Sequence, residues 1–223
     1  MLESTLAFRD RIIELQGWGW NWLTVSFVIT LLFDAAEAWT VALQMRTVKR
    51  EPERHAESLS VKWFCYFGCL LIALGCYGVN DGSGRISIAM LGEGVLGLGF
   101  YVPMMLLLGK VRDYSRTDKA VLAGSVIMIP IVALLPWKDL WVLLFSGGAI
   151  FAMATMPWEI YRNRSRGQVE LGLTLVYLVN VFFWMIYGFA AAVFPLMVAA
   201  PAGVIILLFT VFLWYVYPAG PKR

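Results

Sequence analysis

The sequence predicts an all-α membrane protein with seven transmembrane helices. Of its 223 residues, 60% are apolar or aromatic and only 15% are charged, whereas soluble domains contain about 45–50% apolar and about 25% charged residues. The mean hydropathy is +0.73. These values argue against a disordered chain, a nucleic-acid-binding protein and an ordinary soluble enzyme, and they indicate that the lipid bilayer is the main partner.

Seven apolar runs are long enough to cross a bilayer, since a helix needs about 20 residues to span a hydrocarbon core of ~30 Å. The predicted spans are Trp22–Met45, Val61–Val79, Ile86–Leu108, Ala120–Leu135, Leu140–Ile160, Leu171–Phe194 and Pro195–Tyr217.

The segment before Trp22 carries charged residues and has no apolar run typical of a signal peptide, so we expect no cleaved signal here. Leu6, Ile12, Ile13 and Leu15 are spaced to share one helix face. This spacing predicts a short helix lying at the membrane interface.

The distribution of Lys and Arg predicts the orientation of the chain in the membrane. With the N-terminus outside, the inner side would hold 14 basic residues and the outer side four. The positive-inside rule therefore predicts an external N-terminus and an internal C-terminus. Short loops and a basic inner side suit the bacterial cytoplasmic membrane, and an organellar membrane is the alternative. The inner set is Arg46, Lys49, Arg50, Arg54, Lys62, Lys110, Arg112, Arg116, Lys119, Arg162, Arg164, Arg166, Lys222 and Arg223, and the outer set is Arg9, Arg11, Arg85 and Lys138.

The spans contain signs of an internal repeat. The second span ends in Tyr77-Gly78 and the sixth contains Tyr187-Gly188, and each span follows a basic loop. These features predict three helices, one connecting helix and three helices, a 3+1+3 arrangement of two parallel repeats. Parallel repeats are a known plan of transporters whose site lies at the repeat interface near the bilayer midplane. The predicted units are an N-terminal segment (1–20), a first repeat (21–110), a connecting helix (111–136), and a second repeat with a short tail (137–223).

The second half resembles the SWEET and SemiSWEET sugar transporters and the wider PQ-loop group. The residues that carry the resemblance are Pro157-Trp158-Glu159-Ile160-Tyr161-Arg162-Asn163-Arg164-Ser165, Trp184-x-x-Tyr187-Gly188 and Leu213-Trp214-x-x-Tyr217. The resemblance implies a 3+1+3 fold with an external N-terminus and a carrier function. It also implies that Asn180 and Trp184 contact the solute.

Several positions depart from the family pattern. Pro157 is followed by Trp rather than Gln, and the first half has Leu74 and Leu70 where the second half has Trp184 and Asn180. The paired asparagines of the family's third and seventh helices fall near positions 91–93 and on position 200, which is alanine. The resemblance therefore supports the fold and transport better than it supports sugar as the solute.

Three acidic residues fall inside predicted spans: Asp34, Glu37 and Glu93. An acid at the centre of a membrane helix costs about 2.5–3.5 kcal/mol, so such residues are candidates for function. Asp34 lies 12 residues after Trp22, or about 18 Å along a helix, and Glu37 follows on the same face. The acids suit proton coupling or a cationic solute. The alternative is a structural pairing with Arg46 or with a neighbouring helix.

Asn180, Trp184 and Tyr187 share one face of the sixth span. An amide beside a flat indole suits a polar, partly flat solute such as a sugar or nucleoside. The alternative for Asn180 and Trp184 is an interhelical hydrogen bond and a packing residue. We expect Tyr187 to cap the bundle at its outer end.

Other residues have predicted roles in motion and packing. Pro157 and Pro201 are expected to act as hinges, although prolines also occur in membrane helices without function. The glycines of the third span predict close helix packing. No metal site and no cofactor are expected, because the single histidine, His55, lies in a basic loop.

The leading hypothesis is a secondary carrier that moves a small polar solute, a sugar or a sugar-like molecule, by alternating access. The second is a proton-coupled carrier of an amino acid, vitamin or nucleoside on the same fold. The third is a membrane receptor that binds without carrying, as in the ER-retention receptors that resemble SWEETs. The sequence predicts no enzyme, and it leaves a homo-oligomer open.

Overall fold

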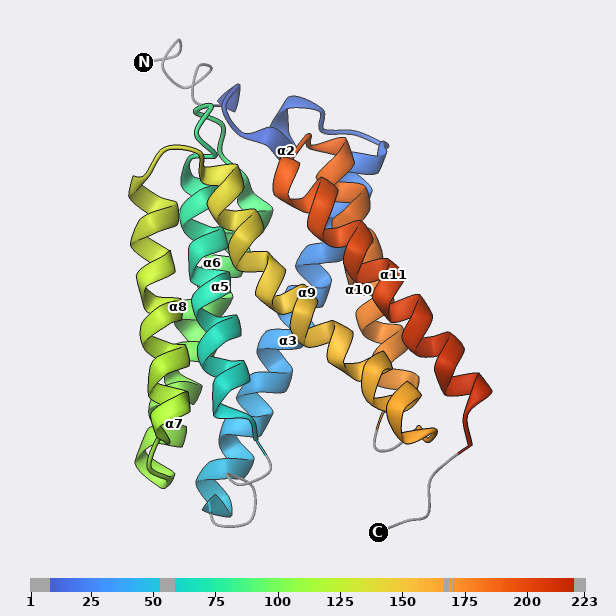
Figure 1. Cartoon of the computed structure of the whole chain (residues 1–223). Helices are drawn as coiled ribbons and strands as arrows, with labels where there is room; N and C mark the ends of the chain where they lie inside the picture. Colours follow the sequence, from blue (N-terminus) through green and yellow to red (C-terminus); the bar gives the residue numbers. More distant parts are fainter. Residues whose placement is uncertain (1–8, 53–58, 167–168, 170, 219–223) are drawn as a thin grey trace.

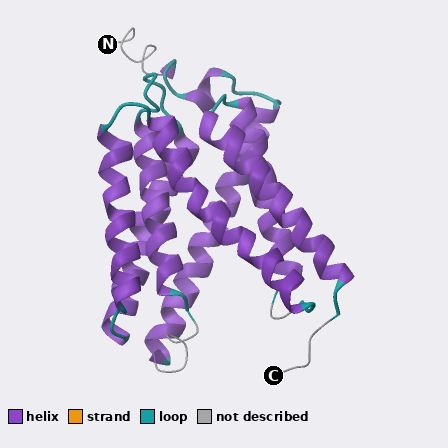
Figure 2. Cartoon of the chain, viewed as in Figure 1, coloured by secondary structure: helices purple, strands orange, loops and turns teal. Residues whose placement is uncertain are grey.

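The computed structural model describes residues 9–52, 59–166, 169 and 171–218, and these residues form helices and no β-strand (Figure 2). His55 and Leu6 lie outside the described residues. The helices are α2 (Ile13–Gln16), α3 (Trp22–Arg50), α5 (Val61–Val79), α6 (Ile88–Leu96), the π-helical segment η1 (Gly97–Tyr101), α7 (Val102–Val111), α8 (Arg116–Leu134), α9 (Lys138–Asn163), α10 (Leu171–Ala190) and α11 (Phe194–Val216).

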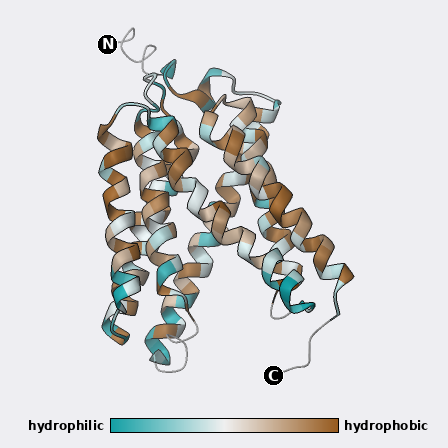
Figure 3. Cartoon of the chain, viewed as in Figure 1, coloured by the Kyte–Doolittle hydropathy of each residue, from teal (hydrophilic) through white to brown (hydrophobic). Residues whose placement is uncertain are grey.

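Seven of the described helices are long and apolar enough to cross a membrane, with α6, η1 and α7 forming one continuous span. Hydrophobic colours run along α8 and α11 in Figure 3. Large side chains such as Phe151, which is 75% exposed, point away from the protein. An apolar outer surface of this kind fits lipid rather than water, and the predicted transmembrane helices are confirmed.

The predicted boundaries hold within a few residues, and the differences have local causes. The fourth span begins at Arg116 rather than Ala120 because Ser115 and Asp118 form a capping box at its start. The first span extends to Arg50, since its basic last turn favours the carbonyl end of a helix. The third span contains the π segment η1, which the sequence did not predict.

Each group of three spans has the same packing order. In the first group, the third span (α6, η1 and α7) packs against both α3 and α5, while α3 and α5 scarcely meet. In the second group, α11 packs against both α9 and α10, while α9 and α10 scarcely meet. We call these groups the first and second triplets. The helix α8 follows the first triplet and packs mainly against α5 (Figure 1).

The turns between the second and third helices of the two triplets also match. The carbonyl oxygen of Gly78 accepts a hydrogen bond from the Ser87 amide at 2.9 Å, and that of Gly188 accepts one from the Val193 amide at 2.9 Å. Both glycines lie where the next helix passes closely. An added Cβ atom would lie 2.8 Å from the Leu91 nitrogen in one case and 2.6 Å from the Leu196 Cβ in the other.

Two interfaces join the triplets. The first helix of the first triplet, α3, packs against α10, the second helix of the other triplet. The first helix of the second triplet, α9, packs against α5, the second helix of the first triplet. The two interfaces are therefore equivalent, because in each one the first helix of one triplet packs against the second helix of the other. The molecule has an α2 end, with the loop 80–87 and the turn 191–193, and an α7 end, where α3 stops and α10 starts (Figure 1).

The predicted interfacial helix lies partly outside the described residues, since Leu6 is not among them. Within the described part of the segment, Ile13–Gln16 forms a single helical turn. Ile12 and Ile13 are buried and pair with the loop at Ile86, where the Ile13 amide donates to the Ile86 carbonyl at 2.9 Å. These two apolar side chains are therefore covered by the α2 end of the bundle.

Gly75 and Gly94 allow α5 and α6 to approach each other closely. The glycines of the third span predict close helix packing of this kind. A Cβ atom on Gly75 would lie 2.5 Å from the Gly94 Cα, and only backbone surrounds it. We therefore expect Gly75→Ala to lower the free energy of unfolding by about 1–3 kcal/mol, through overpacking. Thermal unfolding in detergent measures this change.

The matched control is Gly147→Ala, because nothing lies within 4 Å of a Cβ atom at that position in α9. This variant should keep or slightly raise the stability, since alanine favours a helix by about 1 kcal/mol over glycine. Equal destabilisation by both substitutions would contradict the proposed contact.

Candidate functional site

The acids Asp34, Glu37 and Glu93 come together where α3 faces α6. Asp34 and Glu93 are buried, with exposed fractions of 8% and 7%. A Cβ atom on Gly92 would lie 3.6 Å from Asp34 Oδ2, so Asp34 lies against the turn of α6 that carries Glu93. Glu93 interacts electrostatically with both Asp34 and Glu37. The three carboxyl groups predicted from the sequence thus form one cluster.

Two tyrosines border this carboxyl cluster. The Tyr101 hydroxyl, from η1, donates a hydrogen bond to Glu37 Oε1. Tyr177, from α10, interacts electrostatically with Glu37 across the interface between the triplets. The π segment sets the direction of Tyr101, and single π turns of this kind often occur at functional sites.

Asn180 and Trp184 lie on α10, which runs antiparallel to α3. Because Tyr177 lies opposite Glu37, Asn180 comes one turn nearer the α2 end, at the level of Asp34. Trp184 follows one turn later and is only 8% exposed. Its ring packs edge-on against Tyr187, with 5.6 Å between the ring centroids. The predicted solute residues therefore lie on the helix of the second triplet that packs against α3, which carries Asp34 and Glu37.

Two polar atoms at this junction are buried and have no hydrogen-bond partner, Asp34 Oδ2 and Asn180 Oδ1. A buried unpaired acceptor costs about 1–3 kcal/mol, and more if it is charged. Arg46 forms no ion pair with the three acids within the part of the chain that the structure describes. The purely structural alternative, in which Arg46 or a hydrogen bond satisfies Asp34, thus leaves one oxygen unexplained.

The α2 end is closed by Glu14, which the sequence analysis did not select. Its side chain is fully buried and accepts hydrogen bonds from the Ile88 and Ala89 amides, both at 3.0 Å, at the start of α6. It also accepts from the Tyr187 hydroxyl at 2.6 Å and the Ser87 hydroxyl at 3.1 Å. A carboxylate at a helix N-terminus is electrostatically favourable. Glu14 therefore ties α6 of the first triplet to α10 of the second, and Tyr187 lies at the end of the bundle that it was expected to cap.

Further bonds join the triplets at the same end. The Tyr77 hydroxyl donates to Asp139 Oδ1 at 2.5 Å, and Lys138 Nζ donates to the Asn80 carbonyl at 3.0 Å. The Arg85 guanidinium donates to the carbonyls of Ala191 and Ala192, each at 3.1 Å. We refer to these bonds together with those of Glu14 as the α2-end network.

The α7 end has a different character. Arg112 Nη2 donates to the Leu59 carbonyl within the first triplet, and Arg166 Nε donates to the Tyr217 carbonyl within the second. The helices of the second triplet spread away from α3 and α5 towards this end in Figure 1.

The predicted hinge prolines lie inside continuous helices. α9 runs unbroken through Pro157, which is buried, and α11 runs unbroken through Pro201. Each proline removes one backbone donor from its helix, which makes bending easier at that point. Their role as hinges stays a prediction.

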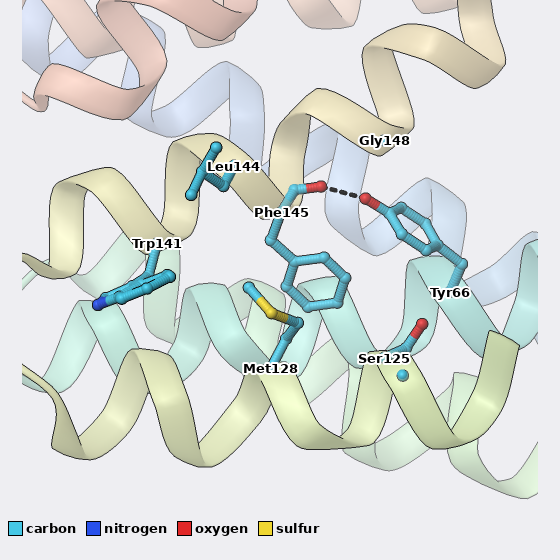
Figure 4. Close-up of a pocket in the computed structure, with 8 residues that line it drawn as sticks. Tyr66, Ser125, Met128, Trp141, Leu144, Phe145 and Gly148 are labelled. Atoms are coloured by element: carbon cyan, nitrogen blue, oxygen red, sulfur yellow. Dashed lines mark hydrogen bonds between the residues drawn. The ribbon is translucent and has the colours of Figure 1, made fainter. Parts of the chain in front are cut away.

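A separate pocket of about 370 Å³ lies between α5, α8 and α9 (Figure 4). Its walls are mostly apolar and include Trp141, Phe145 and Met128, and the Tyr66 hydroxyl donates to the Phe145 carbonyl at one side. None of the residues predicted to bind solute lines this pocket. It lies at the interface of α5 with α9, which is the counterpart of the α3–α10 interface.

Comparisons of the chain with protein-family models, with curated proteins and with solved structures give no match. The resemblance to SWEET and PQ-loop proteins therefore stays a prediction from the quoted motifs. Function has to be argued from the site itself.

Sequence reasoning missed Glu14, Tyr101 and Tyr177. Glu14 lies outside every apolar run, so a search for acids within membrane spans passes over it. Tyr101 and Tyr177 have an ordinary sequence context, and only their neighbours in space distinguish them. The sequence signal for Glu14 is its position directly after two apolar residues, Ile12 and Ile13. The structure buries both of them.

We expect Glu14→Gln to open the α2 end. An amide in place of Oε2 would present a donor to the Ile88 amide, which is itself a donor. Loss of this bond should cost about 1–3 kcal/mol. Hydrogen exchange at Ile88 and Ala89 should accelerate, while Glu159→Gln, at an exposed site of α9, should leave it unchanged. Unaltered exchange in Glu14→Gln would show that the carboxylate does not hold this end.

Asp81 makes the loop 80–87 sensitive to acid. Burial opposes ionisation of its carboxyl, but hydrogen bonds from Ser83 and from Arg85 Nε, at 2.7 Å, outweigh burial and lower its pKa below the usual value. The carboxylate therefore stabilises the fold at pH values above the ordinary carboxyl pKa. That contribution is lost as the pH falls through the lowered value.

The stability difference between the wild type and Asp81→Asn should accordingly be largest near neutral pH and shrink as the pH falls below about 4. Thermal unfolding at a series of pH values measures it. A difference that stays constant down to strongly acid pH would mean that ionised Asp81 contributes nothing.

Proposed function

We propose that this chain is a membrane carrier that moves a small polar solute, sugar-like in size and polarity, by alternating access between its two triplets. The observation that carries the proposal is the pair of unpartnered buried acceptors, Asp34 Oδ2 and Asn180 Oδ1, on helices of different triplets. Buried polar groups in a membrane interior are costly and mark solute pathways. A solute that supplies donors would satisfy both atoms.

The repeated packing supports this proposal. Two triplets with the same helix order and matching turns at Gly78 and Gly188 favour the 3+1+3 arrangement, with α8 as the connecting helix. Transporters built from parallel repeats bind their solute near the midplane at the repeat interface. Asp34, about 18 Å into α3, lies at such a depth.

The two ends of the bundle suggest one state of a transport cycle. The α2-end network holds the triplets together at one end, whereas at the α7 end Arg112 and Arg166 form hydrogen bonds within their own triplets. With the orientation proposed from the Lys and Arg bias, the α2 end faces outward and this state is open to the inside. The bacterial cytoplasmic membrane stays our proposed location.

Proton-coupled transport is the second candidate, and the carboxyl cluster favours it. Two or more carboxyl groups close together in an apolar interior compete for ionisation, so at least one readily holds a proton. Glu93 is the most suitable carrier of that proton, because it is buried and interacts with both other acids.

The experiment is solute uptake into proteoliposomes, using sugars, nucleosides and amino acids, each with and without an inward proton gradient. Trp184→Ala should reduce uptake at least about tenfold, because truncation of a buried aromatic anchor costs about 2 kcal/mol or more. Trp158→Ala, at a position that is 61% exposed, is the matched control.

Uptake that follows the proton gradient and loses this dependence in Glu93→Gln would select the proton-coupled candidate. Undiminished uptake in Trp184→Ala would defeat the assignment of the site. Saturable binding without any entry of solute would reject a carrier and leave a receptor.

A further inference from the structure

The two unpartnered atoms lie on α3 and α10, which pack against each other, and both are acceptors. Asp34 is more than nine-tenths buried and its Oδ2 receives no hydrogen bond. Asn180 Oδ1 is also buried and receives no hydrogen bond. When Asp34 is ionised, a ligand that satisfies both atoms must bring donors rather than acceptors. An ammonium group brings three donors and no acceptor, whereas each hydroxyl brings one donor together with acceptors of its own.

The site also lacks a basic partner for its acidic groups. The sequences of α6, η1 and α10 contain no Lys, Arg or His, and the next basic residue on α3 after Glu37 is Arg46, about 13 Å further along the helix. Arg85 lies outside the site and is held by Asp81 and by the turn at Ala191. No basic side chain among the described residues therefore balances Asp34, Glu37 and Glu93.

A bare metal ion does not fit this cluster. No three His, Cys, Asp or Glu side chains of residues 9–52, 59–166, 169 and 171–218 lie together in a way that could hold a metal ion. Glu37 Oε1 already accepts a hydrogen bond from the Tyr101 hydroxyl. The three acids also lie on two different helices, α3 and α6. A cationic group on a larger organic body can reach Asp34 and Asn180 without being enclosed by all three acids.

Aromatic side chains also lie near the carboxyl cluster. Tyr177 and Trp184 lie on α10 on either side of Asn180, and Tyr101 lies on η1. Aromatic faces attract cations, by about 0.5–2 kcal/mol depending on desolvation, and they also cover a flat apolar body. Carboxylates with aromatic rings are thus suited to a cationic head on a compact organic frame.

We propose that the solute of this site carries a primary ammonium group, which binds Asp34 Oδ2 and Asn180 Oδ1 while its organic body packs against Trp184. This inference rests on the proposed function, since it names the solute class for the same site. The ammonium charge would replace the missing basic side chain beside the three acids.

The experiment compares ligands of the same shape with and without the charge. Tyramine and 2-(4-hydroxyphenyl)ethanol differ only in an ammonium in place of a hydroxyl, and ethanolamine and ethylene glycol form a second pair. Binding to the purified full-length protein in lipid nanodiscs is measured by calorimetry at neutral pH, with sodium and potassium chloride as the inorganic cations. Each amine should bind at least about tenfold more tightly than its neutral partner.

Variants test whether the acids supply this preference. Asp34→Asn and Glu93→Gln should each reduce amine affinity about tenfold and leave the neutral partner's affinity unchanged. Glu159→Gln, at an exposed site, should change neither. The thermal midpoint of each variant shows whether it is folded, and the wild-type comparison stands even if one variant is not.

Equal affinity for amine and alcohol would overturn the proposal, as would tighter binding of sodium or potassium, or no saturable binding of either amine. These outcomes are distinct from failure of the proposed function. Uptake of a neutral solute without amine preference would reject the ammonium inference alone, whereas amine binding without entry into proteoliposomes would reject the carrier alone.

Discussion

An unsatisfied carboxyl oxygen inside an apolar helix bundle is the constraint around which this structure is organised. Asp34 Oδ2 is buried and has no hydrogen-bond partner. Within a bilayer, water cannot compensate for a missing hydrogen bond, so the cost has to be recovered in some state of the protein. A ligand or a proton that joins the site recovers it. In the proposed function, this requirement links the packing of α3 on α10 to solute binding.

The two halves share a packing plan but differ in chemistry. Their third helices lie between the other two, and the turns at Gly78 and Gly188 coincide in their hydrogen bonds. The acids, however, lie on the first triplet, and Asn180 and Trp184 lie on the second. Because α3 of one half packs against α10 of the other, the two sets meet only when the triplets associate. A relative movement of the triplets would therefore alter the site itself.

Much of the fold was predictable, because long apolar runs in a chain with few charges have few alternatives. The span Val61–Val79 was predicted to the residue. The π segment was not, since a single extra residue in a helical turn leaves no mark on hydropathy. Asp34, Glu93, Asn180 and Trp184 could be selected one by one as polar or aromatic residues within spans. Their shared site, and the part that Glu14 plays, depend on contacts between distant segments that no local pattern contains.

In the proposed transport cycle, the triplets separate at one end while they close at the other, around the α3–α10 site. Pulsed electron spin resonance tests it most directly, with labels at Lys62→Cys and Arg162→Cys for the α7 end and at Val79→Cys and Phe194→Cys for the α2 end, after replacement of the three native cysteines. The account predicts two distance populations for each pair. Glu14→Gln, which weakens the α2-end network, should shift the α7-end pair to shorter and the α2-end pair to longer distances. A single population at both ends, unchanged by Glu14→Gln, would contradict the account.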